Sequence, residues 1–511
     1  FFFRMILLHA EVSRFLLSLC VIFCCVLCID VRHALPVTNR SGCIIALGSP
    51  MHSSSVAILK NGHVLIALQI GSLWASKGQQ DHPMNWLLAV QMAEEEIGIT
   101  TPFRSNSTDK YTLGLMGPAG TSNSVKWSLQ MQQYIPVEKW QLMSHHQQGH
   151  AAHAFLDSPF DRALVLTIDG GGNDGWGSLF LAQRSPYNMT ELVSIDYNIG
   201  TGYQYISSAF LLLSRLAKLH DSIPCWAYKK KFPVACRTLP AKLMGLSMMS
   251  TEVYPSWLAK IKRLFHVVPP SKYRELLTRV RQQCRAENGK WIAAMASTVQ
   301  RALEDKVLAF LNNSAVEYWL PRVDGVAFAG GVAFNVRLTS LLQEVLRRPI
   351  HVPAAPDDYG LPIGYAWAAQ PPTHKVACPP FVGPSVNFTG WETAVQQLNL
   401  TSRPLNMLTA AEALVSGKVL GIISGRQEYG TQGLGHRTLV AVPDAQARLW
   451  ACTPFDNIFG RFVLVLREGD VPDVLNEPLV SPYARFTGTL RPRIARRYPN
   501  ITWPNGRIVV Q

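Results

Sequence analysis

Four histidines lie within nine residues in the stretch MSHHQQGHAAHAF, which begins at Met143. His146 and His150 are four residues apart, so on a helix their side chains share one face, about 6 Å apart. That spacing allows two imidazoles to chelate one metal ion. His145 and His153 do not fit this pair, and we expect them to be structural. A solvated polar helix, or core histidines with satisfied hydrogen bonds, is the alternative interpretation.

The residues around such a pair decide which metal chemistry is available. In the HExxH zinc-protease motif a glutamate base follows the first histidine, but Gln147 stands there in this chain, which argues against a metalloprotease. Asp358 lies just before a glycine turn in VPAAPDDYGLPIGYAWA and offers a third ligand. The pattern favours a site with two histidines and a carboxylate, which accepts Fe, Mn or Zn.

Glycine-rich turns follow apolar strands elsewhere in the chain. One ends RALVLTIDGGG (162–172), and Gly330-Gly331 separates a strand from a helix in VDGVAFAGGVAFNVRLTSLLQEVL. Such turns let backbone N–H groups approach a phosphate, and the next helix N-terminus adds positive potential. Earlier in the chain, the turn Asn61-Gly62 joins two apolar runs, and a helix is expected after them at 84–97. The order of strand, turn and helix is the same. This alternation predicts an α/β nucleotide-binding architecture with two similar halves.

The composition is that of a folded protein with two or more domains. The chain has 511 residues, of which 48% are hydrophobic and 16% are charged. The formal charge of +14 comes from scattered residues, and the densest basic run, YKKKF at 228–232, is too short to bind nucleic acid by itself. We therefore expect no nucleic-acid partner.

The first 35 residues predict a signal peptide or a short membrane anchor. An apolar run from Phe15 to Ile29 follows Arg4 and Arg14, and it is shorter than the roughly 20 residues of a spanning helix. Seven Asn-x-Ser/Thr sequons also favour the secretory route. We expect the secretory pathway or membrane association through residues 15–29, with the cytoplasm as the alternative.

The remaining cysteines and the composition shifts give weaker signals. The four cysteines of the apolar run lack a polar scaffold for zinc, and a Cys225–Cys236 disulfide fits a secreted protein. Most other cysteines are expected to be buried thiols. Residues 216–239 show no period and are expected to form a surface insertion, while the proline-rich stretch at 369–386 is expected to link two domains.

Five stretches together resemble the nodulation-type O-carbamoyltransferases, which modify antibiotics and nodulation factors. They are HQQGHAAHAF with SPFDRALVLTIDGGG, LPAKLMGLS, VAFAGGVAFNVRL, APDDYGLPIGYAWA and SGRQEYGTQGLGHRTLVAVP. The resemblance runs in order from about Gly42 to the chain end. It implies an α/β fold with an actin-like ATPase (Kae1-like) domain at 36–370, a linker at 371–388 and an incomplete YrdC-like α/β domain at 389–511.

The resemblance also implies a two-step reaction. The YrdC-like domain joins carbamoyl phosphate and ATP into carbamoyl adenylate with release of pyrophosphate, and the actin-like domain passes the carbamoyl group to a hydroxyl of a small-molecule acceptor. A divalent metal, usually iron, lies near the adenylate, and ATP is a co-substrate. The expected metal ligands are His146, His150 and Asp358. The expected cofactor-binding residues are Asp169, Gly170, Gly172, Lys242, Gly330, Gly331, Asn335 and Lys77. Gly245 belongs to the same matched stretch as Lys242. Whether Asp169 also lies near the metal is left open. The expected catalytic residues are Arg426, His436 and Arg437.

Several positions depart from the family pattern. Ser53 stands where the family has aspartate, Gln432 where it has arginine and Trp503 where it has histidine. The last two positions belong to the part that must hold carbamoyl phosphate and pyrophosphate, where neutral side chains cannot replace a forked cation. Two hypotheses follow: an O-carbamoyltransferase acting on a sugar or natural product, or a catalytically impaired relative that holds metal and nucleotide.

Overall fold

The computed structural model describes most of the chain. The described residues are 23–27, 39–48, 53–70, 83–100, 107–117, 122–216, 236, 238–266, 274–286, 289–376, 378–386, 389–402, 404–445 and 462–511. They cluster into two compact units. The first comprises Phe1–Gly114, Asn123–Trp140 and Cys378–Pro454, and the second comprises Leu115–Ser122, Gln141–Ala377 and Phe455–Gln511. The domain limits expected from the sequence stay a prediction.

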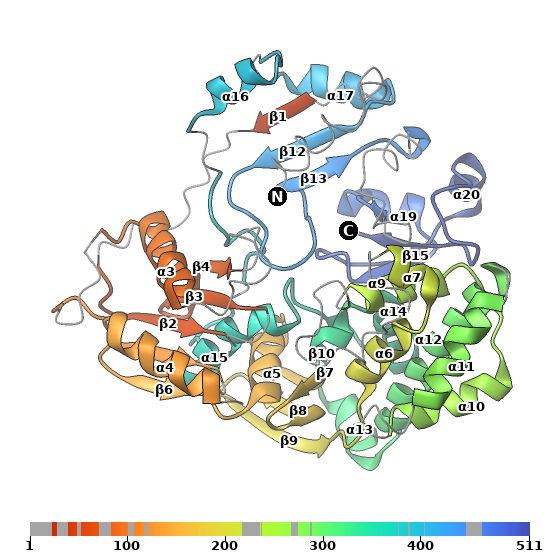
Figure 1. Ribbon diagram of the computed structural model, residues 1–511, viewed down its shortest axis with the longest axis horizontal. Coiled ribbons are helices and arrows are strands. Elements are labelled where there is room, and N and C mark those ends of the chain that lie inside the picture. Colours follow the sequence, from red (N-terminus) through yellow and green to blue (C-terminus); the bar gives the residue numbers. More distant parts are fainter. Residues whose placement is uncertain are drawn as a thin grey trace. The chain divides into compact units, whose positions relative to one another are not determined.

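The first five-stranded sheet has the order β4-β3-β2-β5-β6 (Figure 1). Its strands are β2 (Cys43–Leu47), β3 (Ser55–Lys60), β4 (His63–Gln69), β5 (Leu113–Met116) and β6 (Trp140–Leu142). The turn between β3 and β4 has positive φ at both Asn61 (52°) and Gly62 (79°), which is the twist that a two-residue hairpin requires. This confirms the predicted hairpin. The helix predicted after it is α3 (Pro83–Ile97), which packs on β3 and β4.

The second five-stranded sheet repeats that order as β9-β8-β7-β10-β11. Its strands are β7 (Arg162–Gly172), β8 (Gly175–Gln183), β9 (Asn188–Ser194), β10 (Gly325–Ala329) and β11 (Ile350–His351). The first three strands form an antiparallel meander, and β10 lies parallel to both β7 and β11. In both sheets the first strand is central, its hairpin partners lie on one side, and the fourth and fifth strands lie on the other. The repeat agrees with the predicted pair of similar halves.

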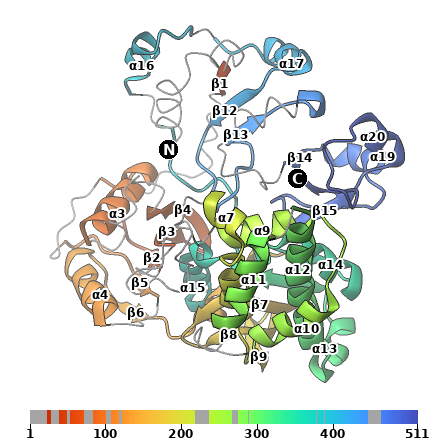
Figure 2. The same ribbon diagram turned by 45° about the vertical axis from the view of Figure 1, so that its right-hand side comes forward.

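Helices cover both faces of the second sheet. Leu164, Leu166 and Ile168 of β7 belong to a large apolar core with residues of α6 (Ile199–Ser207), α9 (Leu239–Ser247) and α12 (Gly289–Leu311). The alternate residues Ala163 and Val165 are also fully buried, and α5 (His146–Asp157) packs on β7, β8 and β10. Because successive strand side chains point to opposite faces, β7 is buried on both sides, as its continuous apolar run predicts. Figure 2 shows α11 and α12 in front of this sheet.

Two three-stranded sheets and the remaining helices complete the described residues. One sheet is β1 (Phe23–Leu27), β12 (Leu420–Ser424) and β13 (Arg437–Val440), and the other is β14 (Val463–Leu464), β16 (Arg507–Val510) and β15 (Phe486–Thr489). The other helices are α4 (Ser122–Tyr134), α7 (Leu211–Leu216), α10 (Pro255–Leu264), α11 (Arg274–Ala286), α13 (Ser314–Trp319), α14 (Val336–Leu346), α15 (Leu361–Ala369), α16 (Trp391–Gln397), α17 (Met407–Val415), α19 (Val471–Val474) and α20 (Pro492–Arg497).

Part of the apolar run that predicted a signal peptide or anchor is a strand. β1 pairs in parallel with β12, from Phe23 opposite Leu420 to Leu27 opposite Ser424. The rest of the first 38 residues lies outside the described residues, as do most of the expected insertion at 216–239 and Cys225. Within the described parts of the chain, no helix is both long and apolar enough to cross a membrane. The leader and the secretory route stay predictions.

The described cysteines agree with the sequence interpretation. Cys43, Cys284 and Cys378 are buried thiols, as expected from the sequence. Cys236 is disulfide-bonded, and its expected partner Cys225 lies outside the described residues.

Candidate metal centre

The helix that the histidine spacing predicts is α5, and almost all of it is buried. The Nε2 atoms of His146 and His150 lie 3.1 Å apart, and the two rings meet edge to face. The turn between β7 and β8 caps the start of this helix. Asn173 accepts a hydrogen bond from the N–H of His146, and Asp174 accepts one from the N–H of Gln147. The turn therefore satisfies two of the N–H groups that a helix start leaves without partners.

Two carboxylates complete the centre from distant parts of the chain. Asp358, at the start of the 3-10 turn Asp358–Gly360, places Oδ1 3.5 Å from His146 Nε2 and 3.4 Å from His150 Nε2. Asp169, near the end of β7, places Oδ2 3.3 Å from His146 Nε2. One ligand atom from each of the four buried residues lies within 4.8 Å of all the others. Asp169, whose distance from the metal the sequence left open, thus belongs to the group.

Glycines allow the elements that carry these ligands to approach one another. A Cβ on Gly172 would lie 2.6 Å from Cβ of His146, so no larger residue fits between the end of β7 and α5. A Cβ on Gly364 of α15 would lie 2.0 Å from the carbonyl oxygen of Gly149 in α5, and one on Gly149 would lie 2.4 Å from the Tyr365 ring. The two helices therefore pack backbone to backbone, which brings the loop before α15 beside the histidines.

The second glycine turn holds Asp169 in place. Gly331 donates its N–H to Oδ1 of Asp169 at 2.7 Å, which leaves Oδ2 facing His146. Gly330 has a φ of 88°, and a Cβ there would lie 2.2 Å from the carbonyl oxygen of Ile168. Glycine is therefore required both for this backbone conformation and for the close approach of β7.

The electrostatics of the centre call for a positive charge. Burial disfavours a charged His146, but the hydrogen bond to Asp169 and the charge of Asp358 raise the pKa of the imidazole to about 9. Burial raises the pKa of the neighbouring Asp357 to about 7, with further contributions from Asp358 and Asp169. Buried carboxylates next to each other are stabilised only by a proton or a cation. Two imidazoles and two carboxylates form a donor set that fits a first-row transition-metal ion.

The other histidines of the stretch lie outside the ligand group. His145 is exposed. His153 is buried, and its burial lowers the pKa of the imidazole to about 4, so it is neutral near pH 7. Neither residue is among the four whose ligand atoms converge.

The residues expected to bind the nucleotide lie on different elements of the fold. Gly170 and Gly172 lie at the end of β7, directly after Asp169. Lys242 and Gly245 lie on α9, where both are buried. Lys77 lies outside the described residues.

Asn335 is part of a buried polar network. Its side-chain oxygen accepts from the N–H of Leu338 at the start of α14, and its amide exchanges two hydrogen bonds with Gln300 of α12. Gln300 also bonds Tyr203 and Glu304. Sequence reasoning missed Tyr203, Gln300 and Glu304 because no motif contains them. The structure uses Asn335 to fix the helix that follows the glycine turn.

The residues expected to be catalytic form a separate cluster in the first unit. Arg426 donates to the carbonyl oxygens of Gly383 (2.9 Å) and Val382 (2.7 Å). Arg437 donates to the carbonyl oxygens of Ser424, His436 and Gly425. The His436 ring stacks on Phe381 with 3.7 Å between ring centroids.

A buried carboxylate organises the same loop. Glu428 Oε1 accepts hydrogen bonds from the backbone N–H groups of Leu434, His436 and Arg437, at 2.7 to 2.9 Å. The Glu428 side chain therefore holds the backbone of residues 434–437 in a curve, with three amides directed at one carboxylate oxygen. Sequence reasoning did not single out Glu428, although it opens the EYGTQGLGHR stretch.

Comparisons with known proteins place this chain among proteins similar to carbamoyltransferases over part of its length. The family model described as "Carbamoyltransferase N-terminus" matches residues 128–367, which include all four ligands. Nodulation protein NolO of Bradyrhizobium diazoefficiens is 28% identical over 315 residues, which cover 59% of this chain and 53% of that protein. An uncharacterized protein of Methanocaldococcus jannaschii is 25% identical over 316 residues, which cover 58% of this chain and 56% of that protein.

The chain spans about half the length of the curated relatives it matches. Among solved structures, T. kodakarensis HypF aligns with a TM-score of 0.37 and 16% identity, over 66% of this chain and 49% of that chain. Residues 128–367 therefore match a carbamoyltransferase family model, and the chain is similar to the nodulation proteins NolO, NolNO and U over part of its length.

Proposed function

We propose that this chain is an ATP- and metal-dependent O-carbamoyltransferase. The observation that carries the proposal is the buried group of two histidines and two aspartates inside the region that matches the carbamoyltransferase family. In this proposal His146, His150 and Asp358 hold the divalent ion, and Asp169 faces it from the glycine turn. When bound, the ion would act as a Lewis acid that polarises carbamoyl or phosphate oxygens.

The glycine turns supply the nucleotide side of the proposed reaction. The turn after Asp169 and the turn at Gly330-Gly331 both follow central strands of one sheet, where backbone N–H groups suit phosphate binding. The repeated strand order of the two five-stranded sheets supports an actin-like ATPase architecture. The proposed sequence begins with the formation of carbamoyl adenylate from ATP, carbamoyl phosphate and water, with release of pyrophosphate and phosphate. The carbamoyl group then passes to a hydroxyl of a sugar or natural product, with release of AMP. The first step would belong to a YrdC-like part within 389–511.

A second candidate is a relative that holds metal and nucleotide but does not activate carbamoyl phosphate. The contacts of Arg426 and Arg437 favour it, because both guanidinium groups donate to backbone carbonyls of their own unit. Gln432, where the family has arginine, is also uncharged. A neutral side chain in place of a phosphate-binding arginine would cost several kcal/mol of transition-state stabilisation.

The test follows pyrophosphate release from ATP by the purified chain, with and without carbamoyl phosphate, in the presence of Fe(II) or Mn(II). Pyrophosphate that depends on carbamoyl phosphate supports the transferase. We expect His150→Ala and Asp358→Ala to lose metal, while His145→Ala, which changes an exposed histidine, keeps it. Metal bound by the wild-type chain without pyrophosphate release would overturn the transferase in favour of the second candidate.

A further inference from the structure

Residues 352–357, the loop before Asp358, have no regular secondary structure, so contacts from other parts of the chain must hold this loop in place. The carbonyl oxygen of Pro356 accepts the N–H of Gly330 at 2.7 Å, which ties the loop to the second glycine turn. The carbonyl oxygen of Ala354 accepts Nη2 of Arg485 at 2.5 Å. Arg485 is 131 residues farther along the chain, in the segment that precedes β15.

Arg485 also touches the other loop of the centre. Its guanidinium carbon lies 4.6 Å from the centroid of the Phe334 ring. Phe334 ends the 3-10 turn Gly331–Phe334, and the first residue of that turn donates its N–H to Asp169. One buried guanidinium, only 1% exposed as a residue, therefore contacts both loops that set the positions of the two aspartate ligands.

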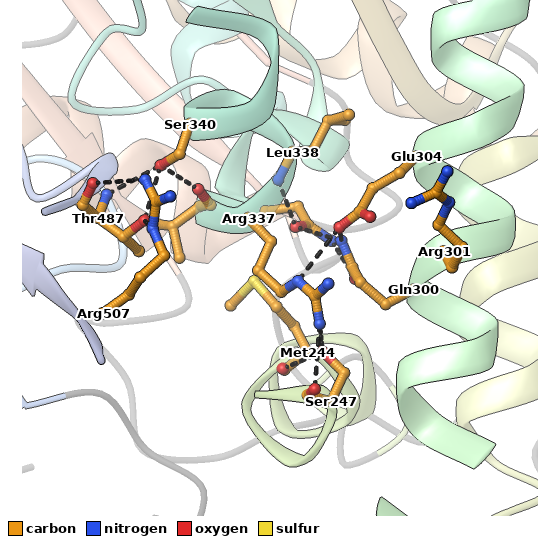
Figure 3. Close-up of polar contacts among 12 residues, drawn as sticks. Met244, Ser247, Gln300, Arg301, Glu304, Arg337, Leu338, Ser340, Thr487 and Arg507 are labelled. Carbon is orange, nitrogen blue, oxygen red and sulfur yellow. Dashed lines mark hydrogen bonds and ion pairs between the residues drawn. The ribbon is translucent and has the colours of Figure 1, made fainter. Parts of the chain in front are cut away.

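The C-terminal hairpin that carries Arg485 is fastened to α14. Thr487 donates its N–H to Oγ of Ser340 at 2.9 Å, and Arg507 donates to Oγ1 of Thr487 at 2.8 Å (Figure 3). Ser481 closes the base of the hairpin, because its Oγ accepts the N–H of Arg485 and donates to the carbonyl oxygen of Val510. These hydrogen bonds hold the backbone of Arg485 in place, and its side chain extends from there to the two loops.

The charge of Arg485 suits this position. Nη2 of Arg485 donates to the carbonyl oxygen of Ala354, and the guanidinium lies over the Phe334 ring. An apolar side chain of similar length would keep the packing against Phe334 but would lose both the charge and the hydrogen bond to Ala354. A guanidinium also stacks on aromatic rings and donates in fixed directions, which a lysine ammonium does not reproduce.

We propose that Arg485 is a positioning residue of the metal centre, through which the C-terminal hairpin holds the Asp358 loop and the Gly331 turn in register. This inference rests on the proposed function, because it takes the four-residue group to be a metal site. It extends the centre to a segment that lies more than 100 residues beyond the matched region 128–367. Residues that orient metal ligands in this way typically change metal affinity by 10–100-fold when they are replaced.

The test is a titration of the full chain with Mn(II), in which the EPR signal of free Mn(II) reports binding. We expect Arg485→Met to raise the Kd by at least about tenfold and Arg485→Lys by less. Arg493→Met is the matched control, because Arg493 lies in the same C-terminal segment with a side chain that is 66% exposed. We expect it to bind Mn(II) as the wild type does. Addition of guanidinium at millimolar concentration to Arg485→Ala should restore part of the affinity, which a loss of folding would not allow.

The outcomes separate this inference from the proposed function. A wild-type chain that binds no Mn(II), Fe(II) or Zn(II) would overturn the metal centre itself. Equal Kd values for the wild type and a folded Arg485→Met would overturn only the role of Arg485. If Arg485→Met does not fold, as judged by circular dichroism, then Arg485→Lys decides: a wild-type Kd together with a wild-type EPR spectrum of the bound ion would overturn the inference.

Discussion

The candidate metal centre and the loop at 426–437 both bury charged side chains, but the partners of these side chains differ in kind. In the metal centre, ligand atoms of two histidines and two aspartates face one another within 4.8 Å. In the loop, the carboxylate of Glu428 is surrounded by backbone N–H groups, and the guanidinium groups of Arg426 and Arg437 end on backbone carbonyls. Side chains that converge on a common point leave a place for an ion. Side chains that end on their own backbone fix a loop.

This difference shows that a retained motif residue does not by itself indicate a retained chemical role. His436 and Arg437 stand where the family resemblance places them, yet their described contacts are those of a loop core. His146 and His150 also stand at their expected positions, and their Nε2 atoms face each other and the Asp358 carboxylate, as the proposed metal site requires.

His150→Ala should nearly abolish metal binding. The change removes one of four converging ligand atoms from a fully buried position, so we expect the Kd for Mn(II) to rise by more than about 100-fold, beyond the cost of outer partners. His145→Ala is the control, because His145 is exposed on the same stretch. Metal content of the purified proteins gives an independent measurement. Stoichiometric metal in His150→Ala would place the ion elsewhere.

Gly149→Ala should damage the metal centre through packing alone. The added methyl group would lie 2.4 Å from the Tyr365 ring, so α5 and α15 must separate. We expect a loss of up to about 3 kcal/mol in unfolding free energy, together with weaker Mn(II) binding. Gly469→Ala is the matched control, because a Cβ there meets no atom within 4 Å. Unchanged stability and affinity in Gly149→Ala would contradict the close helix contact.

Metal should protect the centre and leave the loop at 426–437 unaffected. At 100 times the Kd, an ion that binds only the folded state stabilises it by about 2.7 kcal/mol. We expect slower amide hydrogen exchange in α5 and at Gly331 when Mn(II) is added, and no change at Leu434 or Arg437. Removal of the ion with a chelator should reverse the protection. Equal protection of both regions would show that metal binding stabilises the loop at 426–437 as much as the histidines and aspartates.

Glu428→Ala should loosen the loop without affecting the metal. Three backbone N–H groups would lose their common acceptor inside the protein, at a cost of about 2 kcal/mol. We expect faster amide exchange at Leu434, His436 and Arg437, with the Kd for Mn(II) unchanged. Glu412→Ala, which changes an exposed glutamate on α17, is the control. A large change in metal affinity would show that the two regions are coupled.

The sequence by itself determined the local geometry. Helical periodicity places His146 and His150 on one face, and Asn61-Gly62 allows the positive φ values of a tight hairpin. The glycine turns and the two similar halves also followed from local patterns, because each strand, turn and helix is specified by residues close together in the chain. Asp358 stands before a glycine turn, which offered it as a third ligand, and the family resemblance assigned it to the same site.

Only the tertiary structure decided which distant groups meet. Asp169 lies beside His146 because a Cβ on Gly172 would meet the His146 side chain, and one on Gly330 would meet the backbone of Ile168. Arg485 reaches the Asp358 loop from a hairpin that no motif marks. Whether a charged group faces a neighbouring side chain or its own backbone depends on packing among segments far apart in sequence. For that reason the sequence indicated His150 and Arg437 alike, and the structure distinguishes them.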